Sequence, residues 1–298
     1  MDNGTPPKPN QTITIIVAMC TVVMWSSAFP VTRFLLQHYS PGAIMVLRFI
    51  LASVILIILG FIKKTRLPAL RDIPLCLGLG ISGVFLYNFF FNTASLYVVA
   101  GVSSFIVASA PVITIILARI FLKEVVKPAC WIGVVLSFCG LMVVMISQTT
   151  GFTINIGLLF LLIAAFSGSA MNIFQRLLVL KYTAFEVATY AIIVGTICML
   201  VFLPAGIREL QHSTLPANLA ILYMALFPAV LAYMAWGYAL SKAEKTTHVT
   251  VFMYLVPFLA TLIGYFWLGE TLSPWAWLGG IIIIAGMVLT NVLGRAKG

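Results

Sequence analysis

Long apolar segments separated by short polar breaks dominate this sequence and limit what it can fold into. A helix needs about 20 apolar residues to cross the roughly 30 Å hydrocarbon core of a bilayer. Ten such segments can be marked off at charged, polar or proline-containing breaks. They run over residues 13–36, 41–62, 73–95, 101–122, 128–147, 154–177, 184–205, 217–240, 247–268 and 275–293. The sequence therefore predicts an all-α membrane protein of ten transmembrane helices.

The composition excludes most other classes of protein. Of the 298 residues, 62% are hydrophobic and only 8% are charged, whereas a soluble domain has about 25% charged residues. The net charge of +10 would favour nucleic-acid binding in a soluble protein, but membrane proteins collect Lys and Arg in their cytoplasmic loops. We therefore expect a small-molecule substrate and membrane lipid as partners, no nucleic acid, and a monomer.

The basic residues predict the orientation of the chain in the membrane. Nearly all of them lie at alternate junctions between the predicted helices. They are Lys8, then Lys63, Lys64, Arg66 and Arg71, then Arg119, Lys123 and Lys127, then Arg176 and Lys181, then Lys242 and Lys245, then Arg295 and Lys297. The positive-inside rule then places both termini in the cytoplasm, with residues 1–12 and 294–298 as short tails.

An internal repeat becomes visible when the chain is compared with itself at a shift of 146 residues. Tyr87 then matches Tyr233, and Pro111 matches Pro257. Two further stretches align without a gap. Leu122-Lys123-Glu124 matches Leu268-Gly269-Glu270, and Pro128, Trp131, Gly133 and Gly140 match Pro274, Trp277, Gly279 and Gly286. The repeats cover residues 13–147 and 154–293, with five helices each. Because five is odd, equivalent helices cross in opposite directions, and such inverted repeats are typical of alternating-access transporters.

The motifs resemble the drug/metabolite transporter superfamily, and within it the EamA family. The resemblance rests on Trp25-Ser26-Ser27-Ala28-Phe29-Pro30, on Arg48-Phe49-Ile50-Leu51-Ala52, and on the repeated Pro, Glu and Gly positions. It covers residues 13–293 and implies ten helices around a central cavity, export or exchange of small metabolites such as amino acids, and a bacterial inner membrane. The sixth predicted helix departs from the pattern, because Phe166-Ser167-Gly168-Ser169-Ala170-Met171 has no proline.

Polar and aromatic residues near the middle of the predicted helices are the candidate substrate-binding residues. Aromatic walls with a few hydroxyl and amide groups suit small zwitterions, aromatic molecules or lipophilic cations. Small polar residues also let membrane helices pack closely, so each residue has a structural interpretation as well. The candidates are Trp25, Ser26, Phe29, Tyr87, Asn88, Asn92, Ser167, Asn172, Tyr233, Trp236 and Tyr254.

Arg48 is the one charged residue placed well inside a predicted helix. It lies seven residues into the segment 41–62, about 10 Å from the helix end at 1.5 Å per residue. Its guanidinium could bind a carboxylate or phosphate of the substrate. Alternatively, it could have a structural role, extending towards the membrane surface or bonding carbonyls at a helix end.

Two prolines at equivalent repeat positions, Pro111 and Pro257, interrupt backbone hydrogen bonding inside their helices. They predict bends at equivalent depths, and we interpret them as hinges for two alternating gates. Fixing a static packing arrangement is the alternative role.

The sequence gives no support for enzymatic chemistry. It has no G-x-S-x-G turn, no H-E-x-x-H zinc motif and no P-loop, so we expect no catalytic residues, no metal and no cofactor. All seven acids, among them Glu124 and Glu270, map to termini, loops or helix ends, which argues against tight proton coupling. His248 could still face a cytoplasmic vestibule. A proton-coupled exporter of drugs or lipophilic cations and a passive channel remain alternatives to the metabolite carrier.

Overall fold

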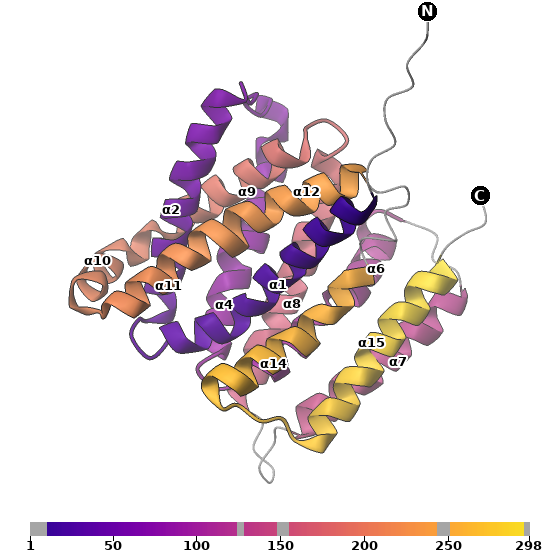
Figure 1. The fold of residues 1–298 in the computed structure, drawn as a ribbon. Helices are drawn as coiled ribbons and strands as arrows, with labels where there is room; N and C mark the ends of the chain where they lie inside the picture. Colours follow the sequence, from indigo (N-terminus) through magenta and orange to yellow (C-terminus); the bar gives the residue numbers. More distant parts are fainter. Residues whose placement is uncertain (1–10, 124–127, 148–154, 243–250, 295–298) are drawn as a thin grey trace, which may run out of the picture.

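The computed structural model describes residues 11–123, 128–147, 155–242 and 251–294, which form a bundle of helices (Figure 1). No strand occurs in these four ranges. The α-helices are α1 (Gln11–Leu35), α2 (Pro41–Ile62), α3 (Ile73–Gly80), α4 (Tyr87–Ala94), α5 (Ala100–Ala108), α6 (Ala110–Phe121), α7 (Pro128–Ser147), α8 (Ile156–Leu178), α9 (Ala184–Met199), α10 (Leu203–His212), α11 (Leu215–Leu226), α12 (Ala232–Lys242), α14 (Val256–Leu268) and α15 (Pro274–Gly294). Glu124 and His248 lie outside the described residues.

Eight helical stretches within the described residues are long and apolar enough to cross a membrane. They are Gln11–Leu35, Pro41–Ile62, Leu70–Ala94, Ala100–Phe121, Cys130–Ser147, Ile156–Leu178, Ala184–His212 and Leu215–Ala239. Shorter apolar helices at Phe252–Leu268 and Pro274–Thr290 coincide with the ninth and tenth predicted segments. The prediction of an all-helical, multi-pass membrane protein is therefore confirmed.

Several spans are not continuous α-helices. Short 3₁₀ turns at Leu70–Asp72, Leu200–Phe202 and Val251–Leu255 precede α3, α10 and α14 respectively. Segments with π-helical hydrogen bonding, Ile81–Leu86 and Phe227–Leu231, join α3 to α4 and α11 to α12.

Local sequence sets where the helices begin and end. Ser40 caps α2 by accepting a hydrogen bond from the Ala43 N–H, with Pro41 in the first turn. Thr183 and Glu186 form a capping box at the start of α9, which satisfies two backbone N–H groups that would otherwise lack partners. Gly269 ends α14 with a φ of 67°, a left-handed conformation that glycine adopts without steric cost.

Helix α10 lies where the sequence predicted only a loop after residue 205. Pro204 in its first turn is compatible with a helix start, and its apolar and polar residues segregate onto different faces. Glu209 accepts a hydrogen bond from the Ser40 backbone N–H at 2.7 Å, which attaches α10 to the start of α2. Apolar runs in the sequence do not reveal α10, because this helix is amphipathic rather than apolar throughout.

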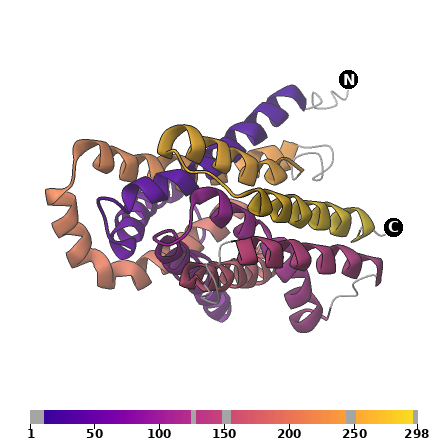
Figure 2. The same ribbon diagram turned by 90° about the horizontal axis from the view of Figure 1, so that it is seen from below.

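Helices α7 and α15 lie side by side along one edge of the bundle (Figures 1 and 2). A Cβ on Gly140 would lie 2.6 Å from the Gly279 carbonyl oxygen, and one on Gly133 would lie 2.6 Å from the Gly286 carbonyl oxygen. The earlier glycine of α7 thus contacts the later glycine of α15, and the later contacts the earlier, so the two helices run antiparallel. Their backbones are in direct contact, as small residues allow between membrane helices.

Two helices are interrupted shortly before the predicted hinge prolines. The helix from residue 100 to 121 is broken at Ser109, two residues before Pro111. In the other half, the 3₁₀ turn ends at Leu255, two residues before Pro257. The two breaks are 146 residues apart, as are the prolines.

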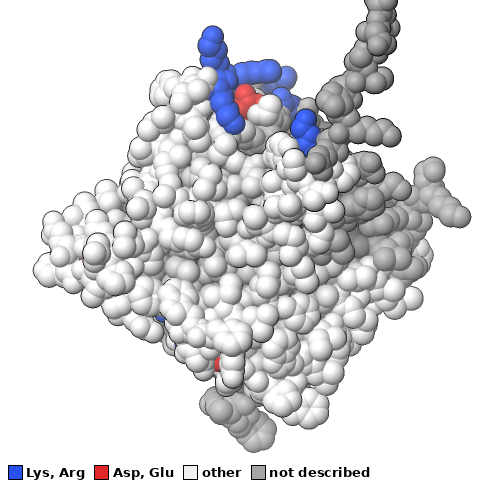
Figure 3. Space-filling view, viewed as in Figure 1, with Lys and Arg blue, Asp and Glu red and all other residues white. Residues whose placement is uncertain are grey.

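Lys and Arg gather at one end of the molecule (Figure 3). We call this the basic end. Among the described residues it includes Lys64 and Arg66, which line one groove, Lys63, which lies over the Phe185 ring, and Arg71 and Lys181 beside Asp72. It also includes Lys242, whose carbonyl accepts a hydrogen bond from Gln11 at the start of α1. At this end Lys181 forms an ion pair with Asp72 at 2.6 Å, and the Tyr182 hydroxyl donates to the same carboxylate.

Candidate functional site

Two π-helical turns place the repeat-related tyrosines of the candidate site. In the first, the Tyr87 N–H bonds the Ser82 carbonyl five residues earlier. In the second, the Ala232 N–H bonds the Phe227 carbonyl, directly before Tyr233. The starts of the two π segments, residues 81 and 227, are again 146 apart. Such turns rotate the residues that follow them around the helix and are frequent at functional sites.

Arg48 extends from α2 towards these tyrosines without a bonding partner. Among the described residues, its guanidinium makes no hydrogen bond and no ion pair, and its Nε is buried and unpaired. The side chain lies 4.8 Å from the centre of the Phe49 ring. The guanidinium is also within electrostatic range of the Tyr87 and Tyr233 hydroxyl groups. A cation in a membrane helix costs about 2.5–3.5 kcal/mol at mid-depth, so an unpaired one needs an explanation.

An aromatic cluster from α1 and α12 adjoins this cation. The Trp25 ring lies 5.6 Å from Tyr233 and 5.3 Å from Trp236, measured between centroids. The Trp25 Nε1–H donates to the Pro228 carbonyl at 3.2 Å, which lies within the second π segment. Tyr233 packs its ring against Trp25 and still keeps 42% of its surface exposed.

A second group of rings surrounds Tyr87 of α4. Tyr87 stacks on Phe91 with centroids 5.9 Å apart, and Phe29 meets Phe91 edge-on at 5.3 Å. Phe29 and Phe91 are both buried. Phe29 therefore acts as packing behind Tyr87 and presents little surface to a ligand.

Three other predicted binding residues each donate a hydrogen bond to a backbone carbonyl within the protein. The Ser26 hydroxyl donates to the Val22 carbonyl, and the Asn88 side-chain amide donates to the Val84 carbonyl. Asn92 is buried, with its Nδ2 bonded to the Pro41 carbonyl and its Oδ1 unpaired. These bonds connect each side chain to backbone groups, which is the structural role for small polar residues in membrane helices.

Three further candidates belong to α8 and to the 3₁₀ turn before α14. Ser167 is buried in α8. Tyr254 is half-buried and packs against a hydrophobic core formed chiefly by α5, α7, α8, α14 and α15. Asn172 lines a separate pocket, so it is not part of the arginine–tyrosine group.

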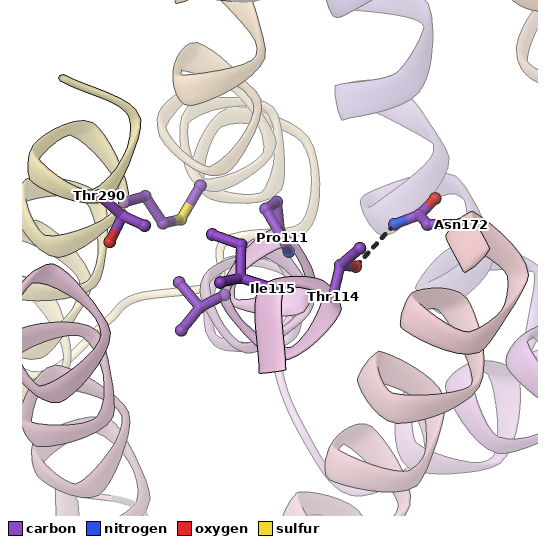
Figure 4. Close-up of a pocket in the computed structure, with 7 residues that line it drawn as sticks. Pro111, Thr114, Ile115, Asn172 and Thr290 are labelled. Atoms are coloured by element: carbon purple, nitrogen blue, oxygen red, sulfur yellow. Dashed lines mark hydrogen bonds between the residues drawn. The ribbon is translucent and has the colours of Figure 1, made fainter. Parts of the chain in front are cut away.

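The pocket at Asn172 has a volume of about 250 Å³ and lies between α6, α8 and α15 (Figure 4). The Asn172 amide donates to the Thr114 hydroxyl at 3.0 Å. Pro111 also lines the pocket, so one predicted hinge borders it directly. Thr114 and Thr290 complete its polar lining. Sequence reasoning missed both threonines, although the position of Thr114 one turn after Pro111 could have indicated it.

An ion pair closes the end of the bundle opposite the basic end. The Arg33 Nε lies 2.7 Å from Glu270 Oε1, and Arg33 Nη1 donates to the Ser95 carbonyl. The other carboxylate oxygen of Glu270 accepts the Ala100 N–H at 2.8 Å. Glu270 thus joins α1, the start of α5 and the end of α14. The repeat had indicated Glu270, but nothing in the sequence paired it with Arg33.

The fold and this site define a multi-pass helical membrane protein with a buried cation and aromatic side chains in its interior. The family model for the EamA-like transporter family matches residues 12–146 and 155–292. The chain therefore belongs to the EamA-like transporter family, which confirms the resemblance drawn from its motifs.

Curated relatives agree with this assignment. The chain is 33% identical over 282 residues to the uncharacterized transporter YdfC of Bacillus subtilis, covering 94% of this chain and 92% of the relative. It is 32% identical over 284 residues to a probable terminal-alkyne amino-acid exporter of Streptantibioticus cattleyicolor, covering 93% of each. The inner membrane transporter YedA of Escherichia coli K12, also uncharacterized, is 25% identical over 271 residues, covering 90% of this chain and 87% of the relative.

A solved crystal structure of a protein shares the fold, with a TM-score of 0.64 at 17% identity, over 96% of this chain and 99% of that one. The family and the relatives together identify the chain as a membrane transporter and not an enzyme. This outcome confirms the expectation that the chain is not an enzyme.

Proposed function

We propose that this transporter carries a small metabolite with a carboxylate group, such as an amino acid, and that Arg48 binds the carboxylate. The observation that carries this proposal is the Arg48 guanidinium, whose Nε is buried and which has no hydrogen bond or ion pair to any described residue. An ionisable residue inside a membrane marks a substrate path by default. A guanidinium fork fits a carboxylate in a bidentate manner.

The aromatic residues around Arg48 suit the remainder of an amino acid. Trp25, Tyr233 and Trp236 form a cluster of ring faces beside the cation. Such faces attract an ammonium group or stack on an apolar side chain. The resident positive charge also disfavours a lipophilic cation, which would meet Arg48 without a compensating acid. The name of the Streptantibioticus relative, an amino-acid exporter, is consistent with this substrate class.

We also propose alternating access between two inverted five-helix repeats. Its support is the set of features spaced by 146 residues: the π segments, the helix breaks before Pro111 and Pro257, and the glycines of α7 and α15. Because α7 and α15 are repeat partners and run antiparallel, the halves that contain them have opposite orientations. Pro111 and Pro257 are the proposed hinges.

The described conformation fits one state of such a cycle. The Arg33–Glu270 pair ties the end opposite the basic end, while Asn172 of the other pocket lies in the last third of α8, which ends three residues before Lys181 of the basic end. The positive-inside rule assigns the basic end to the cytoplasm. Opening towards the outside then requires that Glu270 release Arg33 and the Ala100 N–H. Export as the direction of transport is supported by the resemblance to the family and by the name of the Streptantibioticus relative, an amino-acid exporter.

Counterflow in proteoliposomes tests the substrate assignment. Vesicles preloaded with an amino acid are compared with vesicles preloaded with its amide, which lacks the carboxylate charge, with and without a pH gradient. We expect saturable exchange of the amino acid and little exchange of the amide. Arg48→Gln removes a buried charge that pairs with substrate, a loss of about 2–5 kcal/mol, so the half-saturation concentration rises about thirtyfold or more. The exposed Arg208 on α10 supplies the matched control, Arg208→Gln.

Other results of this experiment would contradict the role of Arg48 or support a different function. Equal exchange of acid and amide, or an unchanged preference in Arg48→Gln, contradicts the role of Arg48. Uptake of a lipophilic cation that requires the pH gradient supports the proton-coupled drug exporter. Flux that does not saturate, without counterflow, supports a passive channel.

A further inference from the structure

A groove of about 540 Å³ lies at the basic end of the bundle, away from the proposed substrate site. Helices α2, α3 and α9 form its walls, and the loop from residue 63 to 69 forms its mouth. Its lining is mostly apolar, with Ile57, Phe61, Leu77 and Ile193 among its residues. The groove thus combines an apolar trough with a basic mouth.

The walls of this groove face outward from the bundle. Phe61 is 81% exposed, and Ile57 and Leu77 are each at least 40% exposed. In a membrane-spanning chain, such apolar exposure faces lipid tails rather than water. A hydrocarbon chain can therefore enter the groove from the side without crossing a polar barrier.

Two cations stand at the mouth. Lys64 and Arg66 both line the groove, and among the described residues neither side chain has a hydrogen bond or ion pair. The Asp72 carboxylate is already paired with Lys181. The remaining nearby acid, Glu186, accepts hydrogen bonds from the Thr183 hydroxyl and from the Thr183 and Arg66 backbone N–H groups.

The loop that carries these cations is fixed by α9. The Arg66 N–H donates to Glu186 Oε1 at 3.0 Å, and the Tyr190 hydroxyl donates to the Arg66 carbonyl. The Thr65 N–H donates to the Gly60 carbonyl at 2.9 Å, and Lys64 adopts a left-handed backbone conformation with a φ of 52°. Both backbone groups of Arg66 are thereby anchored, which leaves its side chain available at a defined position. A site that is ordered before binding loses less entropy when a ligand arrives.

We propose that this groove binds an anionic phospholipid, with one acyl chain between α2, α3 and α9 and the phosphate on Lys64 and Arg66. The charge at the mouth and the apolar trough match the two parts of such a lipid. Basic pockets between helices at the membrane surface recognise anionic headgroups in this way, with about 1 kcal/mol for each Lys or Arg. Arg66 supplies a planar fork for phosphate oxygens and Lys64 a point charge.

Photo-crosslinking of the purified full chain tests the proposal. The protein is placed in nanodiscs of phosphatidylcholine that contain a small fraction of phosphatidylglycerol with a diazirine in the upper half of one acyl chain. A matched phosphatidylcholine probe serves as the neutral comparison. We expect the anionic probe to label peptides containing residues 56–61 and 189–194 over other lipid-facing helices, and the neutral probe to label them weakly.

Two variants separate the contribution of the lipid headgroup to labelling from the contribution of the acyl chain. Lys64→Gln/Arg66→Gln should reduce labelling by the anionic probe about tenfold to thirtyfold. The control, Arg71→Gln/Lys242→Gln, removes the same charge from the basic end at residues that do not line the groove, so labelling should remain. Ile193→Trp fills the trough and keeps the charges, and it should abolish labelling by chain exclusion. An unfolding midpoint near that of the wild type shows that each variant is folded.

Three results would overturn the proposal: equal labelling by the two probes, labelling spread evenly over the bundle, or equal loss in the control and the Lys64/Arg66 variant. If the Lys64/Arg66 variant does not fold, the comparison of probes on the wild type and on Ile193→Trp decides the question. Because substrate exchange is not measured, failure of the lipid site is distinguishable from failure of the proposed function.

Discussion

Replacing Gly140 by Ala tests the direct contact between the α7 and α15 backbones. The added Cβ would lie 2.6 Å from both the Gly279 carbonyl oxygen and the Ile283 backbone nitrogen. Ordinary van der Waals contact begins at 3.4 Å, so the helices must separate locally by about 0.8 Å. Both contacted atoms belong to the backbone, and no change of rotamer can relieve the overlap.

The expected loss follows from that separation. Overpacking of this kind costs about 1–3 kcal/mol, since a radial gap of 0.5–1 Å forfeits a quarter to a half of each attractive contact. Ala in place of a helical Gly also gains about 0.5–1 kcal/mol. Gly237 in α12 supplies the matched control, because its added Cβ meets nothing within 4 Å. The difference between Gly140→Ala and Gly237→Ala therefore isolates the packing loss of about 1–3 kcal/mol.

The free energy of unfolding is measured by titrating mixed micelles with a denaturing detergent and following helicity by circular dichroism. Gly286→Ala should lose about as much stability as Gly140→Ala, because its Cβ would lie 2.6 Å from the Gly133 carbonyl oxygen in the equivalent contact. If Gly140→Ala gained as much stability as Gly237→Ala, the two helices would not be in backbone contact, and the argument for antiparallel repeat partners would be refuted.

Three further perturbations test other parts of the structure. Thr183→Ala removes the side-chain cap of α9 and should lower the unfolding free energy by about 1 kcal/mol, measured in the same titration; no change would mean that the capping box is dispensable. In a double-mutant cycle, Arg33→Gln and Glu270→Gln should show a coupling of roughly 0.5–3 kcal/mol, whereas additive losses would show that the two side chains act independently. Pro111→Ala and Pro257→Ala should each slow counterflow while half-saturation stays unchanged, and unchanged rates in both would contradict the hinge proposal.

The sequence predicted the helices well because the length of an apolar run is itself the physical requirement for a span. It could not predict the π segments at Ile81–Leu86 and Phe227–Leu231. Those segments depend on tertiary packing: a Cβ on Gly83, for example, would overlap the Met171 side chain. Helix α10 was missed for a different reason, since its polar face concealed it from a search for apolar runs.

The candidate site could be predicted in part. The positions of Trp25, Tyr233 and Trp236 within the predicted segments placed them near mid-depth, and the structure brings them together. These positions could not distinguish them from Ser26 or Asn88, whose side chains bond carbonyls of their own helices. That choice depends on which way a helix is rotated about its axis, a property that packing decides and that spacing along one chain does not reveal.

The regular and the irregular helices occupy different places in the bundle, and this distribution bears on the proposed mechanism. Helices α7 and α15 touch backbone to backbone through glycines, so neither can slide without losing contact along the interface. The segments around Ser109 and Leu255 lack an uninterrupted ladder of helical hydrogen bonds. Bending is least costly at such interruptions. The proposed alternating access therefore requires that motion be concentrated at the two equivalent breaks, while the α7–α15 pair stays fixed.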